Sequence, residues 1–415
     1  MTREPNTSLD SAGRLSAVQN LTSNEKKTLA LTGVGHFGCH IAMLVFPTAA
    51  VIMAQTTGMK KEEIYPWGFL CYLLFGICAL PIGLLADRLR ANWGVKLGAL
   101  GVGPALMLVA LADPTSRFEL TAGLALVGVM ASIYHPTGMS LLSKTMTRRG
   151  TSLGLNAICG SAGIALSPIL TEMTAIPYGW RGSFVILGLM LLALGIPVSL
   201  LKIDESPSRE ATETQAHGQG RLDLFCVLLV AMMLGGLSYR ANALSLPGYL
   251  EERQSSETGF GIVTGLLFFV GSIGQMLGGR LADRYDLRFL YMVFHLVSIP
   301  FALAMYSLMG APLYAAAGVF IFCNLGMQPI ENSLVARLTP ERLRTTAYGV
   351  KFIFVFGCGS FAVLGVPWII KAYSFAHVYL AIAAVVAMMF LAICVLTYMS
   401  RGKAVMNADH IVSNT

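Results

Sequence analysis

Residues 29–54 read LALTGVGHFGCHIAMLVFPTAAVIMA and contain no Asp, Glu, Lys or Arg. A helix needs about 20 mostly apolar residues to cross the hydrocarbon core of a bilayer, so this run is long enough to span it. It is also too long for the apolar core of a cleaved signal peptide, and the residues before it are polar. We therefore expect the chain to enter the membrane here.

Similar apolar runs follow along the whole chain. The sequence is 55% hydrophobic and only 12% charged, whereas soluble domains carry about 25% charged residues. We predict an all-α membrane protein with twelve transmembrane helices. The predicted spans are 29–54, 64–86, 94–112, 119–143, 151–174, 183–201, 223–250, 259–282, 289–308, 312–336, 346–370 and 376–399.

The basic residues predict the orientation of these spans. If the N-terminus lies inside, 21 of the 29 Lys and Arg residues fall in inside segments and 6 in outside segments, while Arg240 and Lys351 lie within spans. Connections rich in Lys and Arg stay on the cytoplasmic side. We expect both termini to be cytoplasmic, in the inner (cell) membrane or an internal membrane derived from it. The net charge of +7 then needs no nucleic-acid partner.

One hydrophilic stretch, KIDESPSREATETQAHGQGRL at 202–222, separates six spans from six. It is polar and poor in aromatic residues, which is typical of a flexible linker. The predicted organisation is a cytoplasmic N-terminal tail (1–28), a six-helix bundle (29–201), the linker (202–222), a second six-helix bundle (223–399) and a C-terminal tail (400–415).

The two halves repeat each other. GLLADR at 83–88 returns as GRLADR at 279–284, at an offset of 196. Two further echoes are His135-Pro136 with Gln328-Pro329 at an offset of 193, and His40 and Pro47 with Arg240 and Pro247 at an offset of 200. Transporters built from two such repeats bind their substrate between the halves, near the middle of the membrane.

These motifs resemble the major facilitator superfamily over essentially the whole chain. The first motif copy departs from the family pattern after its Asp-Arg, where this chain has Arg90 and Ala91. The family also commonly has Gly179-Trp180-Arg181 before span 6. The resemblance implies two pseudo-symmetric six-helix bundles, with spans 1, 4, 7 and 10 lining a central cavity. It also implies gating elements, in which the motif Asp sits at a neighbouring helix N-terminus: Asp87, Arg88, Asp283 and Arg284.

Two shorter motifs point to branches of that superfamily. SIYHPTG at 132–138 and GHFGCH at 35–40 resemble the fosmidomycin-resistance-like branch, which is mostly proton-driven efflux. They also resemble the major facilitator proteins of magnetosome membranes, which are thought to carry iron. The small residues Gly160, Gly163 and Ser167 before Pro168 resemble an antiporter element, or equally form a packing face.

Ionisable residues inside spans cost about 2.5–3.5 kcal/mol on insertion scales, so each is a candidate for function. His36 and His40 are four residues apart and share one helix face. They can carry a proton, bind substrate, hold a divalent metal or make structural hydrogen bonds. Tyr134 and His135 precede Pro136, whose ring frees a carbonyl one turn earlier, and are candidates for the same cavity.

The second half carries the other candidates. Arg240 is always charged, and we expect it to clamp an anion or balance a carboxylate opposite His40. Asn324, Gln328 and Glu331 are spaced to share one helix face in span 10. Glu331 is interpreted as a proton carrier, the partner of Arg240, or a structural partner of Arg240 or Lys351. Lys351 and its approximate repeat mate Asn156 are further candidates for the substrate or proton pathway, with snorkelling to the cytoplasmic surface as the alternative for Lys351. Glu172 is interpreted as an interfacial residue.

These candidates predict a secondary active transporter that moves a small solute by alternating access, with proton-coupled efflux of a small organic or anionic compound. The alternatives are transport of an iron species across a magnetosome-type membrane and a transport-inactive scaffold or sensor. No P-loop, HExxH or cysteine cluster is present in the sequence. We therefore expect no enzyme, cofactor or resident metal, and a monomer whose partners are the solute, protons and lipid.

Overall fold

The computed structural model describes residues 21–88, 90–206, 220–253, 259–340 and 343–401, and these are helical apart from short connections. The tails and most of the linker predicted from the sequence lie outside them. Helix α2 begins at Ser23, so residues 23–28 are helical rather than part of a tail. The helices are α2 (Ser23–Thr57), α3 (Lys61–Ile64), η1 (Tyr65–Gly68), α4 (Phe69–Ile77), α5 (Ala79–Arg88), α6 (Ala91–Leu111), α7 (Arg117–Ser132), α8 (Tyr134–Thr145), α9 (Arg149–Ser199), α10 (Leu222–Arg253), α11 (Phe260–Ala282), α12 (Leu287–Ala304), α13 (Gly310–Gly326), α14 (Gln328–Leu338), α15 (Arg344–Phe352), the π-helix η4 (Ile353–Cys358), α16 (Ala362–Ala372) and α17 (Phe375–Met399).

Eleven helices among the described residues are long and apolar enough to cross a membrane. One of them, Gly150–Ser199 within α9, has 50 residues, or about 75 Å at 1.5 Å per residue, more than twice the hydrocarbon thickness. It bends at Gly179, whose φ of 68° and ψ of 176° are not helical. The two arms of α9 correspond to the predicted fifth and sixth spans, so the described residues contain twelve segments of spanning length.

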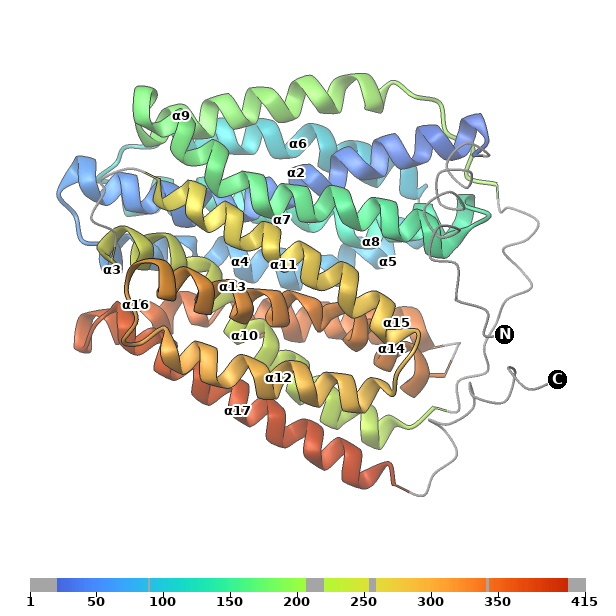
Figure 1. The fold of residues 1–415 in the computed structure, drawn as a ribbon. Helices are drawn as coiled ribbons and strands as arrows, with labels where there is room; N and C mark the ends of the chain where they lie inside the picture. Colours follow the sequence, from blue (N-terminus) through green and yellow to red (C-terminus); the bar gives the residue numbers. More distant parts are fainter. Residues whose placement is uncertain (1–20, 89, 207–219, 254–258, 341–342, 402–415) are drawn as a thin grey trace, which may run out of the picture.

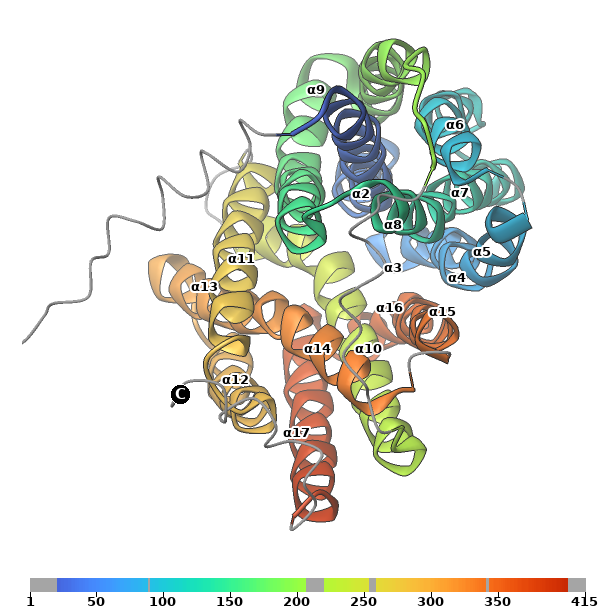
Figure 2. The ribbon, with the colours of Figure 1, turned by 90° about the vertical axis from the view of Figure 1, so that its right-hand side faces the viewer.

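The helices form two groups, α2 to α9 and α10 to α17, which lie side by side (Figures 1 and 2). Ser23 of α2, Leu222 of α10 and Met399 of α17 lie at one end of the molecule, which we call the linker end (Figure 1). The opposite end, which holds α3 and the last turn of α16, is the distal end. The helix axes run between these two ends, as expected for membrane spans.

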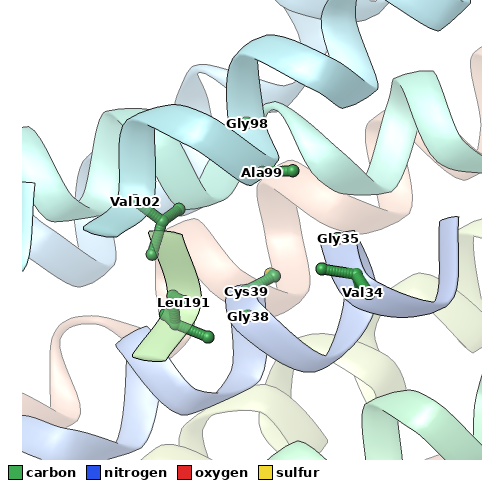
Figure 3. A pocket seen from close by; sticks show the side chains of 8 residues that line it. All are labelled: Val34, Gly35, Gly38, Cys39, Gly98, Ala99, Val102 and Leu191. Atoms are coloured by element: carbon green, nitrogen blue, oxygen red, sulfur yellow. The ribbon is translucent and has the colours of Figure 1, made fainter. Parts of the chain in front are cut away.

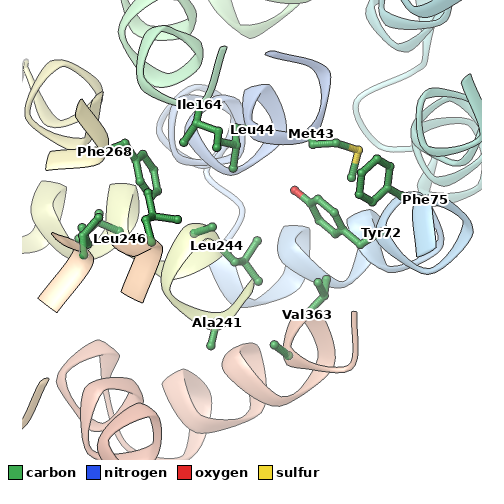
Figure 4. Packing of buried hydrophobic residues seen from close by; sticks show 14 of the residues in the cluster. Met43, Leu44, Tyr72, Phe75, Ile164, Ala241, Leu244, Leu246, Phe268 and Val363 are labelled. Carbon is green, nitrogen blue, oxygen red and sulfur yellow. The ribbon is translucent and has the colours of Figure 1, made fainter. Parts of the chain in front are cut away.

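Helix α2 lies inside the protein rather than against lipid. Every residue from 41 to 53 is buried, and α2 packs on α6, α8 and α9 of its own half and on α10 of the other. Figure 4 shows side chains of both halves meeting here, including Met43 and Tyr72 on one side and Leu244 on the other. Large apolar side chains such as Trp93 and Trp368 are instead exposed, which suits a lipid-facing surface.

Glycines set the closest approaches between helices. A Cβ on Gly76 of α4 would overlap the backbone of Gly357 in η4, and a Cβ on Gly236 of α10 would overlap the carbonyl of Val355. Small residues at such points let membrane helices approach to backbone contact. The π-helix η4 is therefore held between α4 of the first half and α10 of the second.

Candidate functional site

Three histidine rings form a cluster between α2 and α8. His36 and His40 are one turn apart on α2, and their ring centroids are 4.9 Å apart. The ring of His135 on α8 lies 5.3 Å from that of His36 and 5.5 Å from that of His40. The chain therefore brings together the three predicted histidines from two different spans.

A break in the fourth span helps to position His135. The helix stops at Ser132 and restarts at Tyr134, just before Pro136, which has no N–H to donate and crowds the preceding turn. The equivalent break in the tenth span falls between Gly326 and Gln328, just before Pro329. The repeat seen in the sequence is thus also a repeat of helix geometry.

Asn156 of α9 organises one side of the cluster. His36 Nδ1 lies 2.9 Å from the backbone oxygen of Asn156, and the Tyr134 hydroxyl donates to Asn156 Oδ1 at 2.6 Å. The Tyr134 ring stacks on His36 with centroids 4.7 Å apart. A carbonyl only accepts hydrogen bonds, so the proton of the neutral His36 ring is on Nδ1. His36 Nε2 then accepts from His40 Nε2 at 3.2 Å.

His135 connects the cluster to the second half of the molecule. Its ring is 5.2 Å from that of Phe352 and 6.1 Å from that of Phe356, both beyond the linker in sequence, and 5.8 Å from Phe75 of α4. Its Nε2 is buried and has no hydrogen-bond partner among the described residues. A change in how the two halves pack would therefore move the aromatic rings that contact His135.

The small residues of the fifth span form a packing face. A Cβ on Gly160 would lie 2.5 Å from His36 Nε2, and a Cβ on Gly163 would lie 2.5 Å from the carbonyl oxygen of Phe37. Ser167 donates to the carbonyl oxygen of Ile41 at 2.9 Å. This face of α9 therefore fixes how closely α2, and with it the histidine cluster, approaches α9.

Arg240 of α10 is a buried cation with no carboxylate partner among the described residues. It is 4% exposed, and its guanidinium carbon lies 3.7 Å from the ring centroid of Tyr72. It is within electrostatic range of His40. Its Nη1 has no hydrogen-bond partner among the described residues, and none of the ion pairs found between them includes Arg240.

Glu331 of α14 is engaged elsewhere, so the prediction that it partners Arg240 is wrong. Its carboxylate accepts a hydrogen bond of 2.6 Å from the Tyr291 hydroxyl and lies 3.3 Å from Lys351 Nζ. Lys351 also donates to Asn332 Oδ1 at 2.8 Å and is only 8% exposed. It therefore turns inward to its partners and does not snorkel; the structural pair of Glu331 and Lys351, one of the alternatives, is the one observed.

The expected polar face of span 10 is divided by the helix break. Asn324 is buried in α13, whereas Gln328 begins α14. Gln328 Oε1 accepts from Gln275 Nε2 at 2.7 Å, and Gln275 Oε1 accepts from Ser161 Oγ at 2.7 Å. This chain of side chains joins the two halves, a role that the sequence did not indicate.

The expected gating residues are only partly visible. The side chain of Asp87 lies outside the described residues, and Arg88 is exposed. Asp283 and Arg284 are also exposed at the linker end, and α12 is capped by Asp286, not by Asp283. Burial disfavours the charged form of Asp286, but hydrogen bonds from Arg288 and Phe289 outweigh it and lower its pKa.

Glu205 performs the helix-capping role that the motif carboxylate was expected to perform. It follows α9 and accepts from the backbone N–H groups of Ala91 and Asn92 at 3.1 and 3.0 Å, at the start of α6. A carboxylate at a helix N-terminus is stabilised by the unpaired N–H groups and the helix dipole.

Contacts at the distal end join the halves. Glu172 of α9, expected at the interface with lipid headgroups, is 1% exposed and accepts from Gly259 N at 2.9 Å and Ile262 N at 3.1 Å. Lys61 forms an ion pair with Glu251, which also accepts from Gln55 Nε2 at 2.9 Å. The sequence feature that could have indicated this role of Glu172 lies in the other half: α11 starts after Gly259 and has no capping side chain of its own.

A small pocket between α2, α6 and α9 lies apart from this site. Its lining is apolar apart from the Cys39 thiol and includes Gly35, Gly98, Val102 and Leu191 (Figure 3). It offers no charged group to a solute. The histidine cluster and Arg240 are therefore the better candidates for a binding site.

Two groups of six membrane crossings, with buried titratable and charged side chains between them, define a membrane carrier of the repeat type. The family model of the Major Facilitator Superfamily matches residues 32–229 and 228–409. The chain belongs to this superfamily, which confirms the all-helical fold and the resemblance to the superfamily, but not the resemblance to either of its two branches.

Several characterised or named proteins are similar to the chain. A probable L-galactonate transporter of Escherichia coli is 24% identical over 57% of this chain and 56% of its own length. A putative metabolite transport protein of Haemophilus influenzae is 25% identical over 90% of this chain and 95% of its own. A multidrug resistance protein MdtG of Yersinia enterocolitica is 24% identical over 63% of this chain and 66% of its own.

Solved structures show the same fold. A bacterial homologue of the human lysosomal transporter Spinster, inward-facing and occupied, has a TM-score of 0.71 and 16% identity, covering 92% of this chain and 98% of that one. A point mutant of the nucleoside transporter NupG has a TM-score of 0.69 and 13% identity, covering 89% of this chain and 99% of that one. Small-solute transport across a membrane is the activity that this membership implies.

Proposed function

We propose that the chain carries a small organic anion by alternating access, coupled to protons, and that Arg240 holds the anionic group. The observation that carries the proposal is a guanidinium that is 4% exposed and has no carboxylate partner among the described residues. A buried unpaired charge costs several kcal/mol. An anionic solute would remove that cost whenever it is bound.

The surroundings of Arg240 support a binding role over a purely structural one. The guanidinium lies over the Tyr72 ring, and its Nη1 has no hydrogen-bond partner among the described residues, so this donor can bind an anionic solute. Arginine presents these donors in a fork that matches a carboxylate or phosphonate. The E. coli relative named as a probable L-galactonate transporter is named for such an anion.

Proton coupling rests on the titratable groups near this position. A histidine side chain can carry a proton, and the rings of three histidines lie within 5.5 Å of one another, with Arg240 within electrostatic range of His40. Export is favoured by the resemblance of 35–40 and 132–138 to the fosmidomycin-resistance-like branch. Cytoplasmic termini follow from the distribution of Lys and Arg.

The test is flux in proteoliposomes that contain a trapped pH dye. L-Galactonate and the phosphonate fosmidomycin are added in turn, with and without an imposed proton gradient. We expect gradient-dependent flux of at least one of them, its loss in Arg240→Gln and its partial retention in Arg240→Lys. Arg280→Gln, which removes an exposed arginine of α11, is the matched control. Unchanged flux in Arg240→Gln would overturn the role of Arg240, and rates flat from pH 5 to 8 and insensitive to uncouplers would overturn proton coupling.

The alternatives predict different results. A transport-inactive scaffold or sensor would show no flux of any solute, although it has no need of an unpaired buried arginine. Carriage of an iron species in a magnetosome-type membrane would appear as a metal defect in a deletion strain, with unchanged drug tolerance. The three-histidine cluster is the observation that bears on a metal.

A further inference from the structure

The nitrogen atoms of the histidine cluster are close to metal-binding distances. His36, His40 and His135 each offer one ring nitrogen, and these three atoms lie within 4.8 Å of one another. A tetrahedral metal with M–N bonds of about 2.0–2.1 Å holds its nitrogens about 3.3 Å apart. His36 Nε2 and His40 Nε2 are already 3.2 Å apart, so only a small contraction of the cluster is needed to complete the ligand set.

The hydrogen bonds around the cluster favour ligation. Metal-binding histidines usually donate their other ring N–H to a carbonyl or carboxylate, which fixes the tautomer. His36 does so through Nδ1 to the backbone oxygen of Asn156, which turns its Nε2 towards His40. His135 Nε2 is buried without a partner among the described residues, and a metal ion would satisfy it.

We propose that His36, His40 and His135 bind one divalent transition-metal ion of the zinc class. The ligands are the neutral imidazole nitrogens, which suit zinc, copper, nickel or iron better than magnesium or calcium. Three protein ligands leave a fourth position for water or for an anionic ligand. This inference goes beyond the proposed function, because it needs neither proton coupling nor an anion at Arg240.

The positive charge of Arg240 favours an anion over water as the fourth ligand. It lies within electrostatic range of His40, and a cation near the cluster opposes the binding of a dication. An anion at the fourth position would offset this repulsion. The site therefore takes the metal together with an anionic ligand more tightly than the metal with water.

Binding of Co²⁺ to the purified full-length chain tests the proposal without any transport assay. Tetrahedral Co²⁺ absorbs visible light strongly, and equilibrium dialysis gives the stoichiometry. We expect one Co²⁺ per chain, displaced by Zn²⁺ and bound more tightly when acetate is present. Losing one ligand should weaken binding at least about 100-fold, since losing only an outer-shell partner already costs 10- to 100-fold. The ligand variants are His36→Gln, His40→Gln and His135→Gln.

Two further variants separate ligation from a structural role. His377→Gln removes a histidine of α17 whose Nδ1 lies 2.9 Å from the Ser374 hydroxyl, and it should bind Co²⁺ like the unaltered chain. His135→Cys replaces one ligand by a thiolate, so it should still bind Co²⁺ and add a sulfur-to-cobalt charge-transfer band. A chain that binds no Co²⁺, binds it equally well in all three glutamine variants, or shows no new band in His135→Cys would overturn the proposal.

The metal site and the anion-binding role of Arg240 can be disproved independently of each other. Arg240→Gln should lose anion flux yet keep Co²⁺ binding, with affinity in the absence of acetate unchanged or higher because a nearby positive charge is gone. If Co²⁺ binding failed while flux still depended on Arg240, only the metal site would be wrong. If flux were independent of Arg240 while Co²⁺ bound to the three histidines, only the anion role would be wrong.

Discussion

Gly160 is the residue on which the shape of the histidine cluster depends most directly. A Cβ there would lie 2.5 Å from His36 Nε2, so Gly160→Ala must displace the ring or the helix that carries it. We expect this variant to weaken Co²⁺ binding by at least about tenfold, the lower end of the cost of disturbing support around a ligand.

Gly154 supplies the matched control for that variant, because it lies in the same helix and a Cβ there would have no neighbour within 4 Å. Alanine is also the better helix former. Gly154→Ala should therefore bind Co²⁺ like the unaltered chain in the same titration. Equal affinities for the two alanine variants would show that the close contact at Gly160 does not control the cluster.

Lys351 and Glu331 form a second residue-scale test. Both are less than 10% exposed, and breaking a buried ion pair by removing one partner costs about 3–5 kcal/mol, because the other charge is left unpaired. Lys351→Met should therefore destabilise the chain by that amount in equilibrium unfolding by SDS. The double variant Lys351→Met with Glu331→Gln should cost clearly less. Additive costs for the two single changes would mean that the pair is not coupled.

Among the elements, the start of α11 depends on a carboxylate from the other half of the molecule. Glu172 accepts from Gly259 N and Ile262 N, and hydrogen bonds to a charged group are worth about 1.5–3 kcal/mol each. Glu172→Gln should therefore speed amide hydrogen exchange at these two residues by about tenfold or more, measured by mass spectrometry.

Glu205→Gln is the reciprocal control, because Glu205 caps α6 in the same manner. It should speed exchange at Ala91 and Asn92 and leave the start of α11 protected. If Glu172→Gln and Glu205→Gln gave the same exchange pattern, the two carboxylates would not be acting as local caps.

The contrast between Glu172 and His40 shows which parts of the structure the sequence could predict. The helices, their number and the histidine face follow from apolar runs and from the i, i+4 spacing, which are local patterns. The partners of Glu172, Glu331 and Lys351 depend on which helices become neighbours and at what depth. That information is long-range, so the sequence left both Arg240 and Lys351 as possible partners of Glu331, and it did not indicate Tyr291, which also binds it.

Helix breaks are an intermediate case. The prolines at 136 and 329 predict a disturbance nearby, but not that it separates Asn324 from Gln328 into α13 and α14. The span boundary at 174–183 was likewise placed from polarity, whereas the backbone stays helical up to a single non-helical residue, Gly179. Backbone geometry at these points depends on packing against neighbouring helices as well as on local sequence.

At the scale of the whole molecule, the distal contacts keep the two halves together at one end. Lys61 and Glu251 are partly buried, with side chains 16% and 21% exposed, so their attraction is screened less than that of a surface pair. Carriers that work by alternating access rock one half against the other, and such contacts must break when the distal end opens. The closed distal end should therefore be sensitive to the sign of these two charges.

Reversing the charge of Glu251 tests this directly. In Glu251→Lys two ammonium groups face each other and the hydrogen bond from Gln55 is lost, so the distal ends should separate. Spin labels at Arg117 and Met309, which start α7 and precede α13 at that end, should report a longer and broader distance distribution. The reciprocal double variant, Lys61→Glu with Glu251→Lys, restores opposite charges and should return the distribution towards that of the unaltered chain. The double variant contains both substitutions, so it should return to the closed distance distribution only if opposite charges at these two positions hold the halves together. If the double variant gave a distance distribution as long and broad as that of Glu251→Lys, the ion pair would not hold the distal end closed. The packing of α4 on η4 would then be the better explanation for the closed distal end.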